Sequence, residues 1–298
     1  MSFEPVLHSV SYAGVWPGQA RLTLAEFIDK ASDLGFEGLM LMAKRPHLSV
    51  LDYPADACLR LRDRIEAQGL RCAVVAGYNN FTAGLEHAEI PNREIQLQHL
   101  ADLCRMARDL GAPFVRIFTG YDHPALPYVQ ALPSLAETLR EAARRAADCG
   151  VVLAVQNHHD LFAHPDSLRD LLNAVNHPNC RAAFDAWAPA LQGADLIASA
   201  RALAALTVHT TVAGYQVRPR FRYNAAAVNY EASTPWVQAV PMDQNFIDYR
   251  GFLHTLREHG YRGAVAYEMC SPLLGGGSIE NLDRCARAFL DWLRGAGQ

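Results

Sequence analysis

One short phrase recurs along the chain and limits the folds open to it: an amphipathic helix, then a glycine, then a short apolar strand. In its first copy, Thr23 and Glu26 have the spacing of a capping box, so a helix is expected to begin at residue 24. Apolar side chains then recur at helical spacing to Leu34, and Gly35 supplies the left-handed conformation that often ends a helix. A strand over residues 38–42 follows, so this copy predicts one helix–strand unit.

The phrase returns around Gly69, Gly111, Gly150 and Gly260, and three further apolar segments bring the number of predicted strands to eight. These strands are expected over residues 6–12, 38–42, 71–76, 114–118, 151–155, 181–184, 208–211 and 263–267. A spacing of roughly 35–40 residues leaves room for one strand–helix–strand step each. The pattern predicts a single-domain (β/α)8 TIM barrel of the α/β class over residues 1–298. An open doubly wound sheet is the alternative, but no GxGxxG segment follows the first strand.

Composition narrows the class of protein. The 298 residues are 50% hydrophobic, enough for one large core, and the net charge of −4 gives no basic surface for binding nucleic acid. The start of the chain has no signal-peptide pattern, and no apolar run approaches the roughly 18–20 residues that span a bilayer, so no membrane association is expected. The 7 cysteines are scattered and never in CxxC spacing, which favours reduced thiols and a cytoplasmic location.

One connection is unusually long. Residues 212–247, after the seventh predicted strand, run through polar sequence that contains proline and arginine and shows little periodicity. A connection of this length in a compact domain is usually a lid or a binding loop, and its position predicts that it lies over the face where the strands end. Within it, Arg218 and Arg220 could bind a carboxylate or phosphate, although contact with solvent or another subunit is an equal alternative.

Polar side chains gather where the predicted strands end, which is where barrels of this type place functional residues. The candidates at these strand ends are Lys44, Asn79, Arg116, Gln156, His158, His159, Asp185, His209, Thr211 and Glu268. Carboxylate, imidazole and amide groups on one face can hold a divalent cation. Such a cation could clamp a carbonyl and a neighbouring hydroxyl of a sugar while a carboxylate beside it moves a proton. Simpler roles stay open, because Asp185 could cap a turn and His209 could be a core histidine.

The strand-end segments VQNHHD, FDAWAP, VHTTVAGY and AYEMCSP, with a Gly-rich turn after the last, resemble the sugar phosphate isomerase/epimerase superfamily, the barrels similar to xylose isomerase and endonuclease IV. The resemblance covers nearly the whole chain and implies one divalent metal (Mn, Mg, Co or Zn), held by Glu, Asp, His or Gln, and Glu. Asp185 and Glu268 match the second and fourth of these positions. Gln156 stands where the family usually has glutamate, and Thr211 occupies the third position, with His209 two residues earlier and deeper in the barrel.

Gln156 and Thr211, which depart from the family's usual ligands, decide which reactions are expected. Gln156 can offer an oxygen to a metal but cannot act as a base, so Glu268 is the expected base, with His158 or His159 as its proton partner. The leading expectation is a metal-dependent isomerase or epimerase that acts on a sugar, keto sugar or sugar phosphate through an enediolate. One alternative is a lyase on the same scaffold, such as an inosose or dehydroshikimate dehydratase or an enzyme eliminating from a 3-keto-glycoside. Another is a barrel that binds sugar without metal or catalysis. An endonuclease is disfavoured, since its three-zinc cluster needs more ligands than this chain offers.

The Gly-rich turn is a further candidate for substrate contact. Gly276, Gly277 and Ser278 precede a predicted helix over residues 279–293, and glycines at a helix start expose N–H groups to an anion. A plain turn with Ser278 as the N-cap is an equal alternative. Lys44, Asn79, Arg116 and Thr211 complete the expected substrate contacts. The expected partner is therefore a small sugar-like molecule, and a homo-oligomer is left open.

Overall fold

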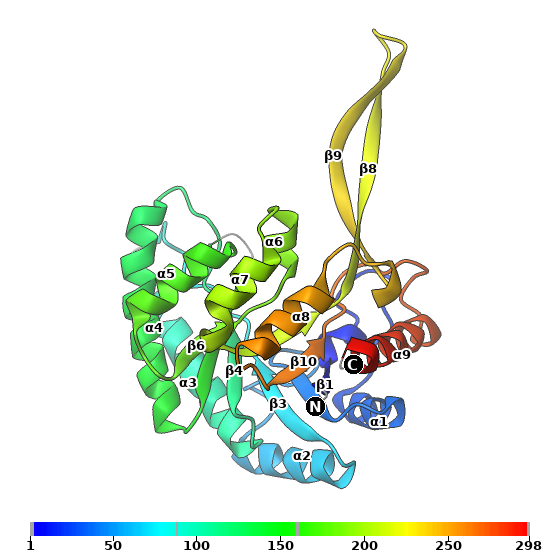
Figure 1. Ribbon diagram of the computed structural model, residues 1–298. Helices are drawn as coiled ribbons and strands as arrows, with labels where there is room; N and C mark the ends of the chain where they lie inside the picture. Colours follow the sequence, from blue (N-terminus) through cyan, green and yellow to red (C-terminus); the bar gives the residue numbers. More distant parts are fainter. Residues whose placement is uncertain (1–2, 88, 159–160, 297–298) are drawn as a thin grey trace.

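Eight parallel strands close into a barrel in the computed structural model, which describes residues 3–87, 89–158 and 161–296 (Figure 1). Their order around the barrel is β1-β10-β7-β6-β5-β4-β3-β2. The bounds are β1 (Glu4–His8), β2 (Gly38–Met42), β3 (Arg71–Ala76), β4 (Phe114–Ile117), β5 (Val152–Gln156), β6 (Cys180–Ala183), β7 (Thr207–Val212) and β10 (Ala264–Tyr267). The predicted single barrel is confirmed, and all eight predicted strands overlap an observed one.

Helices surround the barrel and bury its outer surface (Figure 1). Their bounds are α1 (Leu24–Leu34), α2 (Ala55–Ala67), α3 (Asn92–Asp109), α4 (Tyr128–Asp148), α5 (Pro165–Val175), α6 (Trp187–Leu191), α7 (Leu196–Leu203), α8 (Tyr249–Glu258) and α9 (Ile279–Ala296). The described residues also contain three short 3-10 helices, η1 (Ser9–Tyr12), η2 (Ala204–Leu206) and η3 (Met242–Gln244). No helix in these ranges is both long and apolar enough to cross a membrane. All seven cysteines are free thiols, as predicted.

Helix α1 begins and ends where the sequence predicts. The Thr23 hydroxyl accepts a hydrogen bond from the N–H of Glu26, and the Glu26 carboxylate accepts one from the N–H of Thr23 at 2.8 Å. Gly35 ends the helix with a φ of 89°, a conformation that strains residues with a side chain. The apolar residues at helical spacing are all buried against the barrel. Local capping and periodicity therefore determine this helix.

The first strand is shorter than expected. Residues 9–12 were predicted to continue it, but they form η1, in which the His8 imidazole accepts a hydrogen bond from the N–H of Val10. The hydroxyls of Ser9 and Ser11 accept hydrogen bonds from the N–H groups of Met42 and Met269 and so replace strand pairing. Because every residue of this segment is buried, its apolar pattern does not distinguish a strand from a helical turn.

Residues 212–247 do not form an irregular loop, so this part of the prediction was wrong. They contain β8 (Gly214–Asn224) and β9 (Asn229–Val240), an antiparallel hairpin that rises far above the barrel (Figure 1) and is called the arm below. Only the base of the arm lies at the barrel mouth, while its outer half projects into solvent. The pattern was missed because both faces of the outer half are exposed, so no buried face enforces a clear apolar alternation.

Candidate active site

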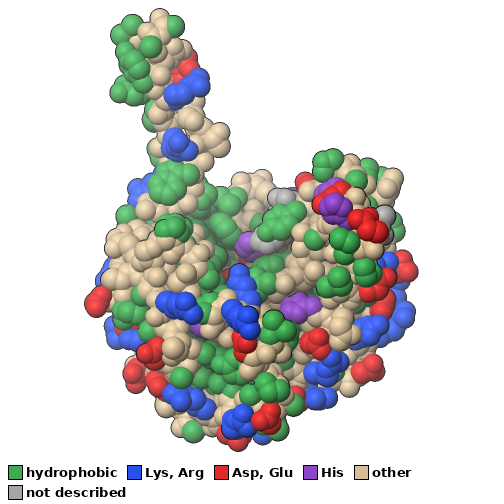
Figure 2. Space-filling model, turned by 180° about the vertical axis from the view of Figure 1, so that it is seen from behind, with side chains coloured by type: hydrophobic (Ala, Val, Ile, Leu, Met, Phe, Trp, Pro, Cys, Tyr) green, Lys and Arg blue, Asp and Glu red, His purple; other side chains and the backbone are tan. Residues whose placement is uncertain are grey.

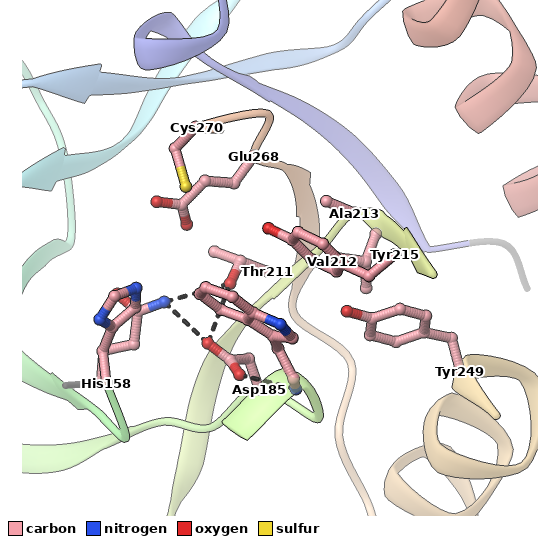
Figure 3. A pocket seen from close by; sticks show the side chains of 11 residues that line it. His158, Asp185, Thr211, Val212, Ala213, Tyr215, Tyr249, Glu268 and Cys270 are labelled. Atoms are coloured by element: carbon pink, nitrogen blue, oxygen red, sulfur yellow. Dashed lines mark hydrogen bonds between the residues drawn. The ribbon is translucent and has the colours of Figure 1, made fainter. Parts of the chain in front are cut away.

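Four neighbouring strands bring polar side chains to one pocket at the C-terminal mouth of the barrel (Figure 3). Gln156 ends β5, Asp185 follows β6, Thr211 lies near the end of β7, and Glu268 follows β10. All four side chains are buried. Parallel strands end at the same edge, so residues more than a hundred positions apart in sequence meet here.

Asp185 is held by a set of hydrogen bonds that crosses three strands. Its Oδ2 accepts from the amide Nε2 of Gln156 at 2.8 Å and from the hydroxyl of Thr211 at 3.4 Å. Its Oδ1 accepts from the N–H of Trp187 at 3.0 Å. Asn157 joins the ends of β5 and β6. Its side chain accepts a hydrogen bond from the N–H of Asp185 at 2.8 Å and donates one to the Asp185 carbonyl at 3.0 Å. The sequence alone did not indicate this role. Asp185 therefore has a fixed position in the pocket.

Glu268 lies across the pocket from Asp185 (Figure 3). Its N–H donates to the carbonyl of Val212 at 3.0 Å, and its Oε1 lies 3.7 Å from Nε2 of His8 on β1. Its Oε2 is buried and has no hydrogen-bond partner within the described residues. Burial raises the pKa of the Glu268 carboxyl, while the charge of Arg116 partly opposes this effect. One oxygen of this carboxylate is thus left for a ligand of the pocket.

Burial also raises the pKa of Asp185, to about 7, and the neighbouring Glu268 charge adds to this effect. The hydrogen bonds from Gln156 and Thr211 act in the opposite direction because they favour the charged form. Two buried carboxylates in one pocket are costly to ionise together unless a positive charge lies near them. The pocket therefore favours a ligand that brings positive charge or hydrogen-bond donors.

Arg116 and His209 were expected in the pocket, but they lie beneath it. Arg116 is 0% exposed, donates to the carbonyl of Gly77 at 3.0 Å, and packs its guanidinium over the Phe118 ring, 4.2 Å from the centroid. His209 is also 0% exposed, and burial lowers its pKa to about 3, so it stays neutral. His209 sits two residues before Thr211 on the same side of β7, one layer deeper. Both predictions are corrected: these residues support the floor of the site and do not line it.

Replacement of Arg116 by alanine is expected to destabilise the fold by about 3–5 kcal/mol. The variant loses two ring contacts and a buried hydrogen bond, and it leaves a cavity beside Glu268. Denaturant unfolding followed by circular dichroism measures this change. Arg60→Ala is the matched control, because Arg60 is exposed and its ion pair in the described part of the chain is with Asp56 on its own helix. A loss below about 1 kcal/mol for Arg116→Ala would contradict its supporting role.

The other expected substrate contacts lie outside the pocket. Lys44 is exposed, with its ammonium 4.1 Å from the centroid of the Tyr78 ring. Asn79 is buried, and its side-chain amide makes two hydrogen bonds with the backbone of Phe118. These two bonds connect the ends of β3 and β4. Arg218 and Arg220 lie on the arm. None of the four residues lines the pocket, so their contact with substrate stays a prediction.

The Gly-rich turn is a packing feature. A side chain at Gly277 would collide with the backbone of Gly18 and Gln19, and Gly276 closes a turn onto the carbonyl of Leu273. The Ser278 hydroxyl accepts from the N–H of Asn281 at 3.3 Å at the start of α9. This hydrogen bond fits the alternative of a plain turn with Ser278 near the N-cap, and the anion site stays a prediction.

Aromatic side chains form the wall of the pocket. The rings of Trp187 and Tyr215 stack, with centroids 4.7 Å apart and planes at 8°, and Tyr249 from α8 lies beside them (Figure 3). His158 lines the pocket between Phe118 and Trp187, whose ring centroids are 5.1 and 5.5 Å from its own. His159 lies outside the described residues. Tyr249 and His8 were missed because nothing in their local sequence marks them as neighbours of β6 and β10.

The donor groups fit a hard divalent cation. Gln156 Oε1 and Glu268 Oε2 are both buried without a partner among the described residues, and each such oxygen costs about 1–3 kcal/mol. Asp185 and Thr211 carry two further oxygen groups; Nε2 of Gln156 faces both of them, at 2.8 and 3.2 Å, so Gln156 would turn its amide to complete an all-oxygen set. Mg²⁺ and Mn²⁺ prefer such oxygen ligands more than Zn²⁺ does. The described ranges contain no group of three or more His, Cys, Asp and Glu side chains placed to hold a metal, because two of the four positions are Gln and Thr. The site therefore suits one cation, held with less charge than the family set implies.

Residues 28–295 match the family of xylose isomerase-like TIM barrels, and the chain belongs to this family. No curated protein matches the chain in sequence. Among solved structures, it is similar to the probable 3-DHS dehydratase AsbF from Bacillus anthracis, at 16% identity over 99% of each chain with a TM-score of 0.73. It is also similar to D-psicose 3-epimerase from Clostridium cellulolyticum H10, at 16% identity over 100% of each chain with a TM-score of 0.73. A third is 3-keto-D-glucoside 4-epimerase YcjR from E. coli, at 14% identity over 98% of this chain and 99% of the other, with a TM-score of 0.70. At these identities the likeness shows the shared fold.

Proposed function

We propose that this chain is a metal-assisted isomerase or epimerase that moves a proton at a carbon next to the carbonyl of a sugar, keto sugar or sugar phosphate. The observation that carries the proposal is Glu268 Oε2, a buried carboxylate oxygen without a described partner, which faces the same pocket as Asp185. The solved structures that share this fold include epimerases and a dehydratase, which supports a reaction of this class. The seven free thiols favour a reducing compartment such as the cytoplasm.

Asp185, Glu268, Gln156 and Thr211 would hold the cation. A bound Mg²⁺ or Mn²⁺ polarises a carbonyl and stabilises the negative charge that develops when the neighbouring carbon loses its proton. Glu268 would accept that proton on the carboxylate oxygen that the cation leaves free, and burial strengthens it as a base because its charged form is poorly solvated. The positive charge of Arg116, beneath the floor of the pocket, lowers the pKa of this carboxyl and so favours its ionised, basic form.

The pocket wall would orient the substrate. The stacked rings of Trp187 and Tyr215 offer a flat apolar surface to the C–H face of a sugar and exclude water from one side of the pocket. His158 lies against Trp187 at the edge of the pocket, where it can exchange a proton with a substrate oxygen. The neutral Gln156 supplies no base at the end of β5, and Asp185 is held by its hydrogen bonds for the cation, so the proton leaves and returns through the Glu268 carboxylate. This arrangement favours isomerisation over a two-base epimerisation.

A lyase is the second candidate, and the same observation of Gln156 favours it. With one base, the carbanion formed next to the carbonyl can also expel a hydroxyl or a sugar from the adjacent carbon. Such a reaction would need no group on the opposite face of the ring. The product would then contain a conjugated double bond.

Proton exchange in D₂O distinguishes these functions. Aldoses, ketoses, 3-keto-glycosides and 3-dehydroshikimate would be incubated with the protein and Mn²⁺ and followed by proton NMR and ultraviolet absorbance. An isomerase or epimerase exchanges a C–H next to the carbonyl for deuterium, and a lyase produces new absorbance. Saturable sugar binding without exchange or elimination across this panel would contradict an enzymatic function and support a binding protein.

A further inference from the structure

The arm exposes an apolar surface that nothing in the described part of this chain covers. Tyr223 on β8 pairs with Tyr230 on β9, and their rings meet at 5.4 Å. Phe221 lies two residues from Tyr223 and so shares its face. The exposed fractions are 64% for Phe221, 53% for Tyr223 and 67% for Tyr230, and Val228 near the tip is 76% exposed. Figure 2 shows apolar side chains gathered at the end of the projection.

A two-stranded hairpin of this kind is marginally stable alone in water. The outer half of the arm packs against no other element, and both of its strands leave their outer edges unpaired within the described residues. Strand edges of this kind pair readily with other chains unless they are protected. An arm of 11 and 12 residues per strand is therefore expected to gain its stability from a partner.

Charge favours a second copy of this chain as that partner. The arm carries Arg218, Arg220 and Arg222 against one acidic residue, Glu231, which is a net charge of +2 by count. The whole chain carries −4, so the remainder carries −6. A basic arm with an acidic body is complementary to another copy of itself, since each copy offers both partners of the attraction.

Area also favours a symmetric exchange. The free part of the arm, residues 218–236, has about 7–8 residues per strand; at about 3.3 Å per residue it is roughly 25 Å long, and two strands make it roughly 10 Å wide. One such face against an unrelated protein would bury on the order of 550 Å², well below the roughly 1,000 Å² expected of a stable interface. Two exchanged arms double this to on the order of 1,100 Å², which reaches that size.

The acceptor surface lies across the barrel mouth. In the closed strand order, β3 stands four places from β7, so the loop after β3 is diametrically opposite the arm. This loop exposes Leu85 and Ile90, at 40% and 45%, beside the exposed carboxylates of Glu86 and Glu89. We call these four residues the rim. The rim has the apolar and acidic character that matches the aromatic and basic character of the arm.

We propose that two copies of this chain form a dimer by exchanging arms, each arm lying against the rim of the other copy. This inference is independent of the reaction in the pocket. It predicts that the protein in solution has about twice the monomer mass of 32.8 kDa. The arm then serves as an interface element and is not a lid of its own barrel.

Light scattering after size exclusion, from 1 to 50 μM protein, tests the dimer. In a shortened variant, Asn-Gly replaces residues 218–236, which keeps the paired Val217 and Val237 and closes the hairpin with a two-residue turn. This variant is expected to be a folded monomer. Phe221→Ser/Tyr230→Ser is expected to raise the dimer Kd at least about 100-fold. The control Leu51→Ser/Leu59→Ser changes two exposed apolar residues elsewhere and should stay dimeric. A monomeric natural chain, or a dimeric shortened variant, overturns the proposal.

A charge exchange tests the acceptor surface. Arg220→Glu/Arg222→Glu gives an acidic arm facing an acidic rim, and Glu86→Arg/Glu89→Arg gives a basic arm facing a basic rim, so each variant alone is expected to be monomeric. Mixed together, they restore both attractions in one heterodimer, which is expected to form. Failure of the mixture to dimerise, with both variants folded by circular dichroism, overturns the assignment of the rim.

Discussion

Glu268→Gln is expected to lower kcat by about 10³-fold, within the 10²–10⁴ range of a lost general base, while leaving the fold intact. The amide keeps the shape of the carboxylate but cannot accept a proton. Among the described residues, the ion pair of Glu268 is the 3.7 Å contact with His8, so the loss of charge should not unfold the barrel. Deuterium exchange into the substrate found by the NMR panel measures the rate.

The control for this variant is Glu258→Gln on the surface of α8, which should retain full activity. Thermal unfolding of both variants, with and without Mn²⁺, shows whether the fold survives. Full activity of a folded Glu268→Gln would exclude Glu268 as the base, and the reaction would need another proton acceptor.

Gln156→Glu is expected to raise the affinity for Mn²⁺ by about 10- to 100-fold, because it places a third carboxylate among the oxygen donors. Without metal, the same change should destabilise the fold, since a new negative charge would lie where Nε2 now donates to Asp185 at 2.8 Å. Calorimetric titration gives the affinity, and melting temperatures with and without chelator give the two stabilities.

The matched control is Gln192→Glu, which adds the same charge at an exposed position after α6. It should change neither quantity. An unchanged Mn²⁺ affinity in Gln156→Glu would remove Gln156 from the metal site. A stabilised metal-free variant would contradict the crowded negative charge in the pocket.

Local signals in the sequence predicted the barrel well. The capping box at Thr23, the glycine at the end of α1 and the repeated apolar strands are properties of neighbouring residues, and the structure follows them closely. The convergence of Gln156, Asp185, Thr211 and Glu268 was also predictable, because the closed barrel brings every strand end to one mouth. The topology alone places such residues together.

Contacts between distant segments could not be predicted. Arg116 and Asp185 both stand at strand ends, yet Arg116 points into the barrel core and Asp185 into the pocket. The direction depends on register across the barrel, which one strand does not encode. The sequence around Gly277 is also typical of an anion-binding loop, and only the structure reveals that this glycine is needed for its close approach to the backbone of Gly18. The two strands of the arm were not predicted because a hairpin with no buried face lacks the alternation of apolar and polar residues that identifies a strand.

If Asp185, Glu268, Gln156 and Thr211 together bind one hard divalent cation for proton transfer, protein purified without chelator should retain it. We expect elemental analysis to find close to one Mg²⁺ or Mn²⁺ per chain, lost in Asp185→Ala while the fold persists. No bound metal, together with no change in melting temperature on adding Mg²⁺ or Mn²⁺, would contradict it and indicate metal-free chemistry or sugar binding alone.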